Sequence, residues 1–342
     1  MKVLLVGGTG VISTGSHAEI LSRGYELYLL NRGNSTARVT PGAKVLVADY
    51  NDEAATKAAI GDLLFDTVVD FRIMNVEGIE KAVRIFSGHT KQYIFISSGT
   101  VYKKPLPNYI ITEDAPLGNI HSAYARNKLA AEYALRRHID KGFPGVIVRP
   151  SLTYSDFNPL TSLNSRKHPY TLIHRMRKGK PIVVNGDGTS LWTITHNTDF
   201  ARGIVGLFGN PATIGEAFHI TSDEVLDWDR IYTYLAHAAG VDANLLHIAS
   251  DYLGEWNPDL RESLLGDHSC SAVFDNSKIK KFVPDFHCEI PFEEGAKRVV
   301  AWFDADPAAR ATVDRDWDND MDELVATYCV GLPKRKPGIS WL

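Results

Sequence analysis

The chain has 342 residues, of which 44% are hydrophobic and 23% are charged, and its formal net charge at pH 7 is −4. These proportions predict a globular protein of about two domains, and the acidic balance argues against nucleic acid as a partner, because a nucleic-acid-binding surface needs a concentrated basic face. No apolar run approaches the roughly 20 residues that span a bilayer, so we expect no membrane segment.

The N-terminus and the cysteines bear on cellular location. Residues 1–7 enter a β-rich run at once and leave no room for a signal peptide. Cys270, Cys288 and Cys329 are odd in number, widely spaced and without C-x-x-C spacing. They indicate neither a disulfide framework nor a metal site, so we expect a cytoplasmic protein with no bound metal.

The first 150 residues alternate short β-rich runs with helical patterns. Helices are expected near residues 14–23, 53–64, 76–88 and 121–141. Buried strands are expected at Lys2–Val6, Glu26–Asn31, Lys44–Ala48, Thr67–Phe71, Gln92–Ser97 and Gly145–Arg149. Such alternation predicts an α/β fold with a Rossmann-type, doubly wound parallel sheet that is covered by helices on both faces.

From Ser151 the alternation stops. Residues 155–168 are rich in Asn, Ser and Pro, which suggests a loop over a ligand cleft. A strand followed by a helix returns at Ile194–Phe208, and another strand at Glu216–Thr221, so we expect the chain to rejoin the first domain there. We therefore predict a nucleotide-binding domain of residues 1–155 plus about 193–222, and a smaller substrate-binding domain of about 156–192 plus 223–342.

A glycine-rich turn, Gly7-Gly8-Thr9-Gly10, follows the first strand and opens a helix, which is the context that a dinucleotide-binding turn requires. Gly7 permits the tight turn, and Gly10 lets the backbone approach a pyrophosphate. Val11 and Ile12 follow directly and complete the expected cofactor contacts of this turn. The alternative reading of the motif alone is a glycine turn that binds no ligand.

The second strand ends at Asn31-Arg32-Gly33, where a carboxylate would bind the ribose hydroxyls of NAD. Asn31 is neutral, and Arg32 can pair with the 2′-phosphate of NADP. We therefore favour NADP(H) over NAD(H). In the alternative, Arg32 turns to solvent and Asn31 binds the ribose without discrimination.

Three further residues carry the expected chemistry. Ser98 follows the strand at Gln92–Ser97, and Tyr124 and Lys128 share one face of the next helix. A free tyrosine has a pKa near ~10, and a lysine cation within a few ångströms would lower it by roughly 1–3 units. We expect Tyr124 as the acid–base group, Lys128 as its support and a ligand of the nicotinamide ribose, and Ser98 as the group that holds the substrate oxygen. Thr100 is a further candidate for a substrate hydrogen bond.

The glycine turn, the Ser97–Thr100 motif and Tyr-x-x-x-Lys, in this order, resemble the extended short-chain dehydrogenase/reductases of the NAD-dependent epimerase/dehydratase group. Arg149-Pro150, Gly186-Asp187-Gly188-Thr189 and His196 with Asp199 extend the resemblance over most of the chain. The last glycine of the family's turn is Ser13 here, which is small enough for close packing of helix on strand.

The resemblance implies further contacts. Asp49, which is followed by Tyr50 at the end of the third strand, would hydrogen-bond the adenine amino group. Two helices, near 76–88 and 121–141, would pair with their twins in a homodimer. The expected contact residues are apolar, namely Leu129, Ala130, Tyr133 and Ala134 on one helix and Ile79, Ala82, Val83 and Phe86 on the other.

Departures from the family bear on the substrate. Nucleotide-sugar epimerases carry an arginine at the position of Trp192 and another before a Gly-Asp pair, where this chain has Leu264-Leu265. Losing both disfavours a diphosphate, and Trp192 either stacks on an uncharged sugar ring or lies in the core. Gly99-Thr100 replaces the Asp-Glu pair of the dehydratases, which disfavours dehydration. Arg72, after the fourth strand, either reaches the cofactor or substrate or pairs with Asp70.

We therefore expect an NAD(P)-dependent oxidoreductase that transfers hydride at a carbonyl or alcohol carbon of a sugar- or polyol-like substrate. The candidates for substrate contact are Thr100, His121, Ser151 and Trp192. An epimerase that oxidises its substrate transiently would use the same residues. A third reading is an RNA-binding module, since Asn31-Arg32-Gly33 resembles chloroplast stem-loop RNA-binding relatives, but the intact catalytic set and the acidic net charge speak against it.

Aspartates alternate between residues 314 and 322 as they do in calcium loops. The glycine and glutamate that such a loop needs are Asn319 and Val325, so we expect no calcium site. Asp320 with Glu323 is typical of a cap, and predicts a helix at Leu324–Val330.

Overall fold

The structure is a computed structural model that describes residues 1–34, 36–159 and 161–331. Its centre is a seven-stranded sheet in which all neighbouring strands are parallel, in the order β11-β7-β5-β4-β1-β2-β3. The strands are β1 at Lys2–Val6, β2 at Glu26–Asn31, β3 at Lys44–Val47, β4 at Thr67–Asp70, β5 at Tyr93–Ile96, β7 at Gly145–Pro150 and β11 at Ala217–Ile220. The chain runs outward from β1 to β3 and then crosses to β4, so the topological switch point lies between β1 and β4.

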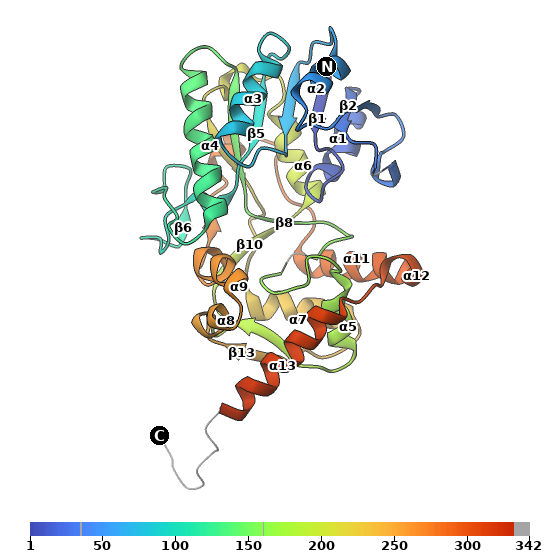
Figure 1. Ribbon diagram of the computed structural model, residues 1–342, viewed down its shortest axis with the longest axis vertical. Coiled ribbons are helices and arrows are strands. Elements are labelled where there is room, and N and C mark those ends of the chain that lie inside the picture. Colours follow the sequence, from blue (N-terminus) through green and yellow to red (C-terminus); the bar gives the residue numbers. More distant parts are fainter. Residues whose placement is uncertain (35, 160, 332–342) are drawn as a thin grey trace.

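Both faces of the sheet are covered by helices, which is why its strands are continuous apolar runs (Figure 1). Alternate residues of β1 face opposite cores, with Leu4 and Val6 on one side and Val3 and Leu5 on the other. The first core is closed by α2 at Glu53–Ile60, α3 at Val76–Phe86 and α4 at Ala123–Ile139. The second is closed by α1 at Ser16–Ser22, α6 at Asn197–Gly206 and α10 at Ser277–Phe282. The predicted α/β class and parallel sheet are confirmed.

The chain leaves the sheet after β7 and returns to it. β8 at Leu152–Tyr154 pairs in parallel with β10 at Leu191–His196, which also pairs with β12 at Val225–Asp227. From β10 the chain enters α6, which packs on α1 so closely that a Cβ on Gly15 would lie 2.3 Å from the Asn197 carbonyl oxygen. β11 then adds to the edge of the sheet beside β7. The domain boundaries themselves stay a prediction.

Most of the remaining elements lie at the carboxyl end of the sheet, below it in Figure 1, and β6 lies beside the lower end of α4. Part of them surrounds an aromatic core that includes Trp192, Trp228 and Tyr232, whereas α8, α9 and α13 pack in a separate apolar cluster. The strands are β6 at Ile110–Ile111, β9 at Ile182–Asn185, β13 at Leu245–Ile248 and β14 at Val273–Phe274. The helices are α5 at Tyr170–Arg177, α7 at Trp228–Ala238, α8 at Ser250–Trp256, α9 at Pro258–Ser263, α11 at Phe292–Ala305, α12 at Pro307–Arg310 and α13 at Arg315–Gly331.

One local expectation was wrong. The helix α13 begins at Arg315 and not at Leu324, because Asp314 accepts the Trp317 N–H at its start while Asp318 and Asp322 pair with Arg175.

The described part of segment 155–168 packs partly into the aromatic core, where the Ser162 and Tyr232 hydroxyls are 2.9 Å apart. Its Phe157 ring lies 4.4 Å from the guanidinium of Arg38, which donates to the Thr9 carbonyl of the glycine-rich turn. That this segment runs over a ligand cleft stays a prediction.

None of the helices in the described ranges combines the length and the apolar character needed to cross a bilayer. Over the same ranges, no three His, Cys, Asp or Glu side chains are grouped as metal ligands would be.

Candidate active site

Two cavities open at the carboxyl edge of the sheet, where parallel α/β sheets bind ligands. The larger cavity, of about 410 Å³, is lined by Gly7, Gly10–Ser13, Phe71, Arg72, Met74, Ile96–Thr100, Tyr124, Lys128, Pro150–Thr153, Trp192, Asp267 and Phe274. The smaller cavity, of about 180 Å³, is lined by Gly7, Thr9, Gly10, Leu30–Arg32, Asn34, Ala48–Tyr50 and Arg72. They share Gly7, Gly10 and Arg72, so the two cavities meet over the glycine turn at the switch point.

Two side chains, Ser13 and His17, fix the conformation of the glycine turn. Gly7 has φ +77°, which only glycine adopts without strain. The buried Ser13 hydroxyl donates to the Gly7 carbonyl and accepts the Gly10 N–H, both at 2.9 Å. His17 Nε2 lies 2.7 Å from the Gly8 carbonyl, and burial lowers the pKa of His17, so the neutral ring donates this hydrogen bond. The turn is thus held in shape by Ser13, at the edge of the larger cavity, and by His17, which lines neither cavity.

The smaller cavity brings together the residues predicted to bind the adenosine end of a dinucleotide. Asn31 Oδ1 accepts the Gly33 N–H at 2.8 Å, which leaves the buried Asn31 Nδ2 without a partner among the described residues. Arg32 and Asp49 are exposed at the rim. The Tyr50 hydroxyl is directed away, since it donates to Asp70 Oδ2 at 2.5 Å. Only the ring of Tyr50 is therefore available to a ligand.

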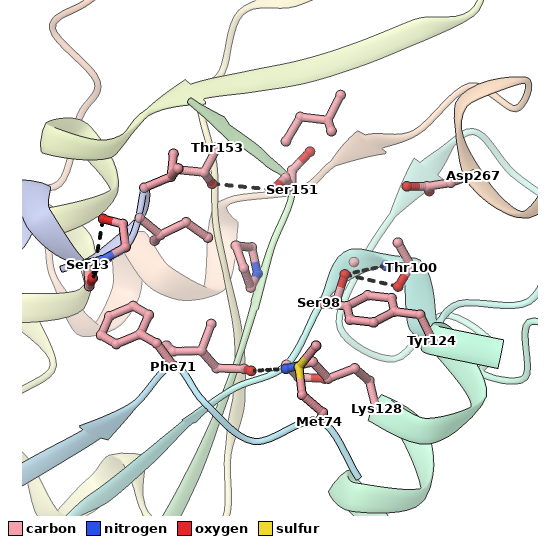
Figure 2. A pocket seen from close by; sticks show the side chains of 18 of the residues that line it. Ser13, Phe71, Met74, Ser98, Thr100, Tyr124, Lys128, Ser151, Thr153 and Asp267 are labelled. Carbon is pink, nitrogen blue, oxygen red and sulfur yellow. Dashed lines mark hydrogen bonds between the residues drawn. The ribbon is translucent and has the colours of Figure 1, made fainter. Parts of the chain in front are cut away.

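Ser98, Thr100 and Tyr124 lie together on one wall of the larger cavity (Figure 2). Ser98 Oγ accepts hydrogen bonds from the Thr100 hydroxyl at 3.0 Å and the Thr100 N–H at 3.2 Å. Because two donors already point at this oxygen, the Ser98 O–H is left to donate to a ligand. Tyr124 follows Ser122, whose side chain caps α4 by accepting the Ala125 N–H.

Lys128 lies behind Tyr124 and is nearly fully buried. Its ammonium donates to the carbonyls of Ile73 at 2.5 Å and Ile96 at 2.9 Å, and it lies 5.7 Å from the centre of the Tyr124 ring. Burial lowers the pKa of Lys128 to about 8, against the opposing charges of Asp70 and Glu132.

The expected effect of Lys128 on Tyr124 was wrong for this state of the protein. Desolvation raises the pKa of Tyr124, Asp267 raises it further, and only the neighbouring Ser98 hydroxyl lowers it. The physical reason is that the Lys128 ammonium is turned to two backbone carbonyls and not to the phenol. Tyr124 is therefore a protonated phenol at neutral pH.

A buried ion pair fixes the helix that carries Tyr124 and Lys128. Arg149, on β7, donates to both carboxylate oxygens of Glu132 on α4, at 3.0 and 2.7 Å, and both side chains are 1% exposed. The Ser97 hydroxyl donates to the same carboxylate at 2.6 Å. The pair joins α4 to two strands of the sheet directly below the catalytic residues.

The far end of the larger cavity is lined by Asp267 and by Trp192 of the aromatic core. The Asp267 carboxylate points toward the cavity in Figure 2, and the buried Lys104 Nζ lies 3.6 Å behind it. Trp192 contacts the cavity but is only 2% exposed, and it packs against Trp228 at 5.6 Å. The core interpretation of Trp192 is therefore correct, and an open face for sugar stacking is not present.

The other two substrate candidates differ in their placement. Ser151 lines the larger cavity, although its hydroxyl donates to the Thr193 carbonyl at 2.7 Å. His121 is exposed and is not among the described residues that line this cavity. Ser151 thus lies where a substrate contact is possible, and His121 lies outside the lining of this cavity.

Comparison with known proteins agrees with this geometry. Residues 3–221 match the sequence model of the NAD dependent epimerase/dehydratase family. The chain belongs to this family. The predicted family is confirmed, and the protein is an enzyme of the oxidoreductase or epimerase kind.

Two relatives within this family show the range of functions. The chloroplast stem-loop binding protein of 41 kDa b from Arabidopsis thaliana is 27% identical over 256 residues, 70% of this chain and 63% of the relative, so the match spans less than two thirds of that protein. The 2′-dehydrokanamycin reductase of Streptomyces kanamyceticus is 23% identical over 287 residues, 84% of this chain and 80% of the relative.

A solved structure of this fold is that of UDP-glucose 4-epimerase from Bifidobacterium longum in complex with NAD+ and UDP. It matches with a TM-score of 0.72 and 20% sequence identity, covering 91% of this chain and 100% of that chain. At this identity the likeness shows the fold alone.

The residues present fit the dinucleotide that this family binds. Two cavities joined at a glycine turn suit a ligand with two ends and a narrow middle, and the exposed Arg72 lines both of them. Sequence reasoning missed Asp267 as a cavity residue. The signal in the sequence was the Gly266-Asp267 pair itself.

Proposed function

We propose that this enzyme transfers hydride between a nicotinamide cofactor and a carbonyl or alcohol carbon of a sugar- or polyol-like substrate. One observation carries the proposal: Ser98, Tyr124 and Lys128 line one cavity, and that cavity continues over the glycine turn into a second one. The cofactor, when bound, supplies or accepts the hydride.

The roles of the protein groups follow from their contacts. The free Ser98 O–H donates to the substrate oxygen, while Thr100 holds Ser98 in place. Tyr124, as a protonated phenol, gives its proton to this oxygen when a carbonyl is reduced and takes it back in the reverse direction. The Lys128 cation binds the nicotinamide ribose and stabilises the phenolate that forms.

An uncharged or amino-bearing sugar suits the larger cavity better than a nucleotide diphosphate sugar. Asp267 lies at its far end, and the only arginine among the described lining residues is Arg72, beside the glycine turn. A carboxylate accepts hydrogen bonds from hydroxyl or ammonium groups and repels phosphates. The reductase relative, by its name, acts on 2′-dehydrokanamycin, which supports a sugar carbonyl as the reacting group.

The test is to incubate the protein with NADPH or NADH and a panel of keto-sugars, and to follow cofactor absorbance. Stoichiometric oxidation of the cofactor supports a reductase. A sugar that is isomerised while a tightly held cofactor is not consumed would show the epimerase alternative. No binding of either cofactor, together with salt-dependent retention of structured RNA on a filter, would favour the RNA-binding reading that the Arabidopsis relative suggests.

Two finer proposals accompany the function. NADP(H) is preferred, because the exposed Arg32 offers a donor for a 2′-phosphate at the smaller cavity and Asn31 is neutral where a carboxylate would select NAD. We also propose a homodimer through α3 and α4, with a corrected face. Ile79, Ala82, Phe86 and Ala134 are fully buried within the subunit and were wrong as contact residues.

The exposed Tyr133 and the partly exposed Val83, Leu129 and Ala130 remain as the dimer surface. Tyr133→Glu should turn a dimeric mass in light scattering into a monomeric one. A monomeric wild type at micromolar concentration contradicts the dimer.

A further inference from the structure

The glycine turn of this enzyme has one backbone donor that is already in use. Ser13 stands at the last glycine position of the turn, and its Oγ accepts the Gly10 N–H at 2.9 Å. The same hydroxyl donates to the Gly7 carbonyl, so the turn is closed on itself. α1, which follows, has only seven residues and therefore a small dipole. The turn therefore offers fewer backbone N–H donors to an anion than a turn with three glycines would.

Arg72 lies directly over this turn. A Cβ built on Gly7 would lie 2.7 Å from both Cγ and Cδ of Arg72, so the aliphatic part of the side chain rests on the glycine. The Arg72 side chain is exposed and lines both cavities. Any ligand that occupies both cavities must pass Gly7, Gly10 and Arg72.

The Arg72 guanidinium makes no hydrogen bond or ion pair with the described residues. The nearest carboxylate in sequence, Asp70, is fully buried and already accepts three hydrogen bonds from other groups. Asp70 Oδ2 accepts the hydroxyls of Tyr50 and Tyr93 at 2.5 and 2.9 Å, and Oδ1 accepts the backbone N–H of Arg72 at 2.8 Å. Asp70 thus fixes the Arg72 backbone and leaves its charge free.

We propose that Arg72 binds the diphosphate of the dinucleotide and replaces the backbone donor that Ser13 takes from the turn. This assignment rests on the proposed function, since it presupposes a dinucleotide across the two cavities. A guanidinium is suited to the task because its planar fork donates two hydrogen bonds to phosphate oxygens. Arg72 therefore acts on a part that NAD and NADP share, whereas Arg32 lies at the cavity for the adenosine end.

The experiment is to titrate wild type, Arg72→Met and Arg32→Ala with NADH, NADPH and ADP-ribose. Methionine keeps an apolar stem on Gly7 and removes the charge. Arg72→Met should weaken all three nucleotides by a similar factor of roughly ten or more, and Arg72→Lys should recover part of the loss. Arg32→Ala is the matched control, because it should weaken NADPH alone. Thermal unfolding of each variant without ligand checks that the fold is intact.

A second variant tests the link to Ser13. Ser13→Ala frees the Gly10 N–H, so Arg72→Met should cost less affinity in that background than in wild type. Unchanged affinities in Arg72→Met, or a loss confined to NADPH, overturn the diphosphate assignment. Equal losses in both backgrounds overturn the compensation by Arg72. A wild type that binds none of the three nucleotides overturns the proposed function itself.

Discussion

The two cavities of the site differ in how their polar groups are satisfied. In the larger cavity, Ser98 accepts two hydrogen bonds from Thr100, and Lys128 donates to two carbonyls. At the smaller cavity, Asn31 Nδ2 has no partner among the described residues, and Arg32 and Arg72 are exposed. The catalytic half is held in place by the protein, whereas the cofactor half keeps its donors for a polyanion. The larger cavity therefore provides a fixed geometry for the chemical step, whereas the smaller cavity provides positive charge for binding the cofactor.

The largest effect in the catalytic half is expected from removal of the Tyr124 hydroxyl. Tyr124→Phe should reduce turnover by roughly 10²–10⁴-fold, the usual contribution of a general acid–base group, and leave cofactor affinity nearly unchanged. Steady-state assays with the substrate, paired with NADPH titrations, measure the two quantities. Substantial remaining turnover would show that Tyr124 is not the acid–base group. The larger cavity would then no longer be the catalytic half of the site.

The next largest effect concerns the support below the catalytic helix. Arg149→Met leaves the Glu132 carboxylate buried without its cation, and should reduce the free energy of unfolding by about 3–5 kcal/mol. Denaturant unfolding measures this loss. Arg84→Met is the matched control, since the Arg84–Glu53 pair lies at the surface and its loss should change the stability little. Equal losses would show that the buried pair has no special role.

As pH rises, deprotonation of Lys128 should increase the stability of the fold and decrease turnover. Its pKa is lowered to about 8 in the fold, so the unfolded chain binds more protons between pH 8 and the ordinary lysine value near ~10.4. The destabilisation is therefore complete below pH 8 and is relieved as pH rises through this window. Turnover, which needs the cation, should fall over the same window.

The measurement is the difference between wild type and Lys128→Met in unfolding free energy and in turnover from pH 7 to 10. Parallel stability profiles of the two proteins would contradict the lowered pKa. Lys128→Met should also weaken cofactor binding, and a change in turnover alone would refute the ribose contact.

The smallest expected effect lies in the cofactor half. Arg32→Ala should cost NADPH about tenfold in affinity, because it removes one exposed charge-assisted hydrogen bond, and should leave NADH unchanged. Fluorescence titration measures both. Arg23→Ala is the control, because that guanidinium pairs with Glu19 on α1. Equal wild-type affinities for the two cofactors would leave NAD(H) as the cofactor.

Much of the fold could be predicted because its strands are buried on both faces. Continuous apolar runs such as Val3–Val6 identify such strands without any tertiary information, and Ser122 marks the start of α4. The helix α13 could not be placed in this way. Its first turns are acidic, and they are stabilised by Arg175 from a distant part of the chain.

The residue types of the candidate site could be predicted from the sequence, but their hydrogen-bond partners could not. Local spacing places Tyr124 beside Lys128, but the carbonyls that hold the ammonium belong to Ile73 and Ile96 on other elements. The same holds for Tyr50, whose hydroxyl donates to Asp70, and for Trp192, which the aromatic core buries. Each of these depends on contacts that only the folded chain creates.

The return of the chain to the sheet has a consequence for synthesis. β11 is the last strand of the sheet to leave the ribosome, and until residues 217–220 arrive, β7 is an open edge. All six residues of β7 are buried in the finished protein, so the waiting edge exposes both apolar side chains and unpaired backbone groups. A fragment that stops after β8 keeps the glycine turn, Ser98, Tyr124 and Lys128, yet its bare edge would recruit other nascent chains. The sheet thus depends on residues 217–220 to cover the edge that β7 would otherwise expose.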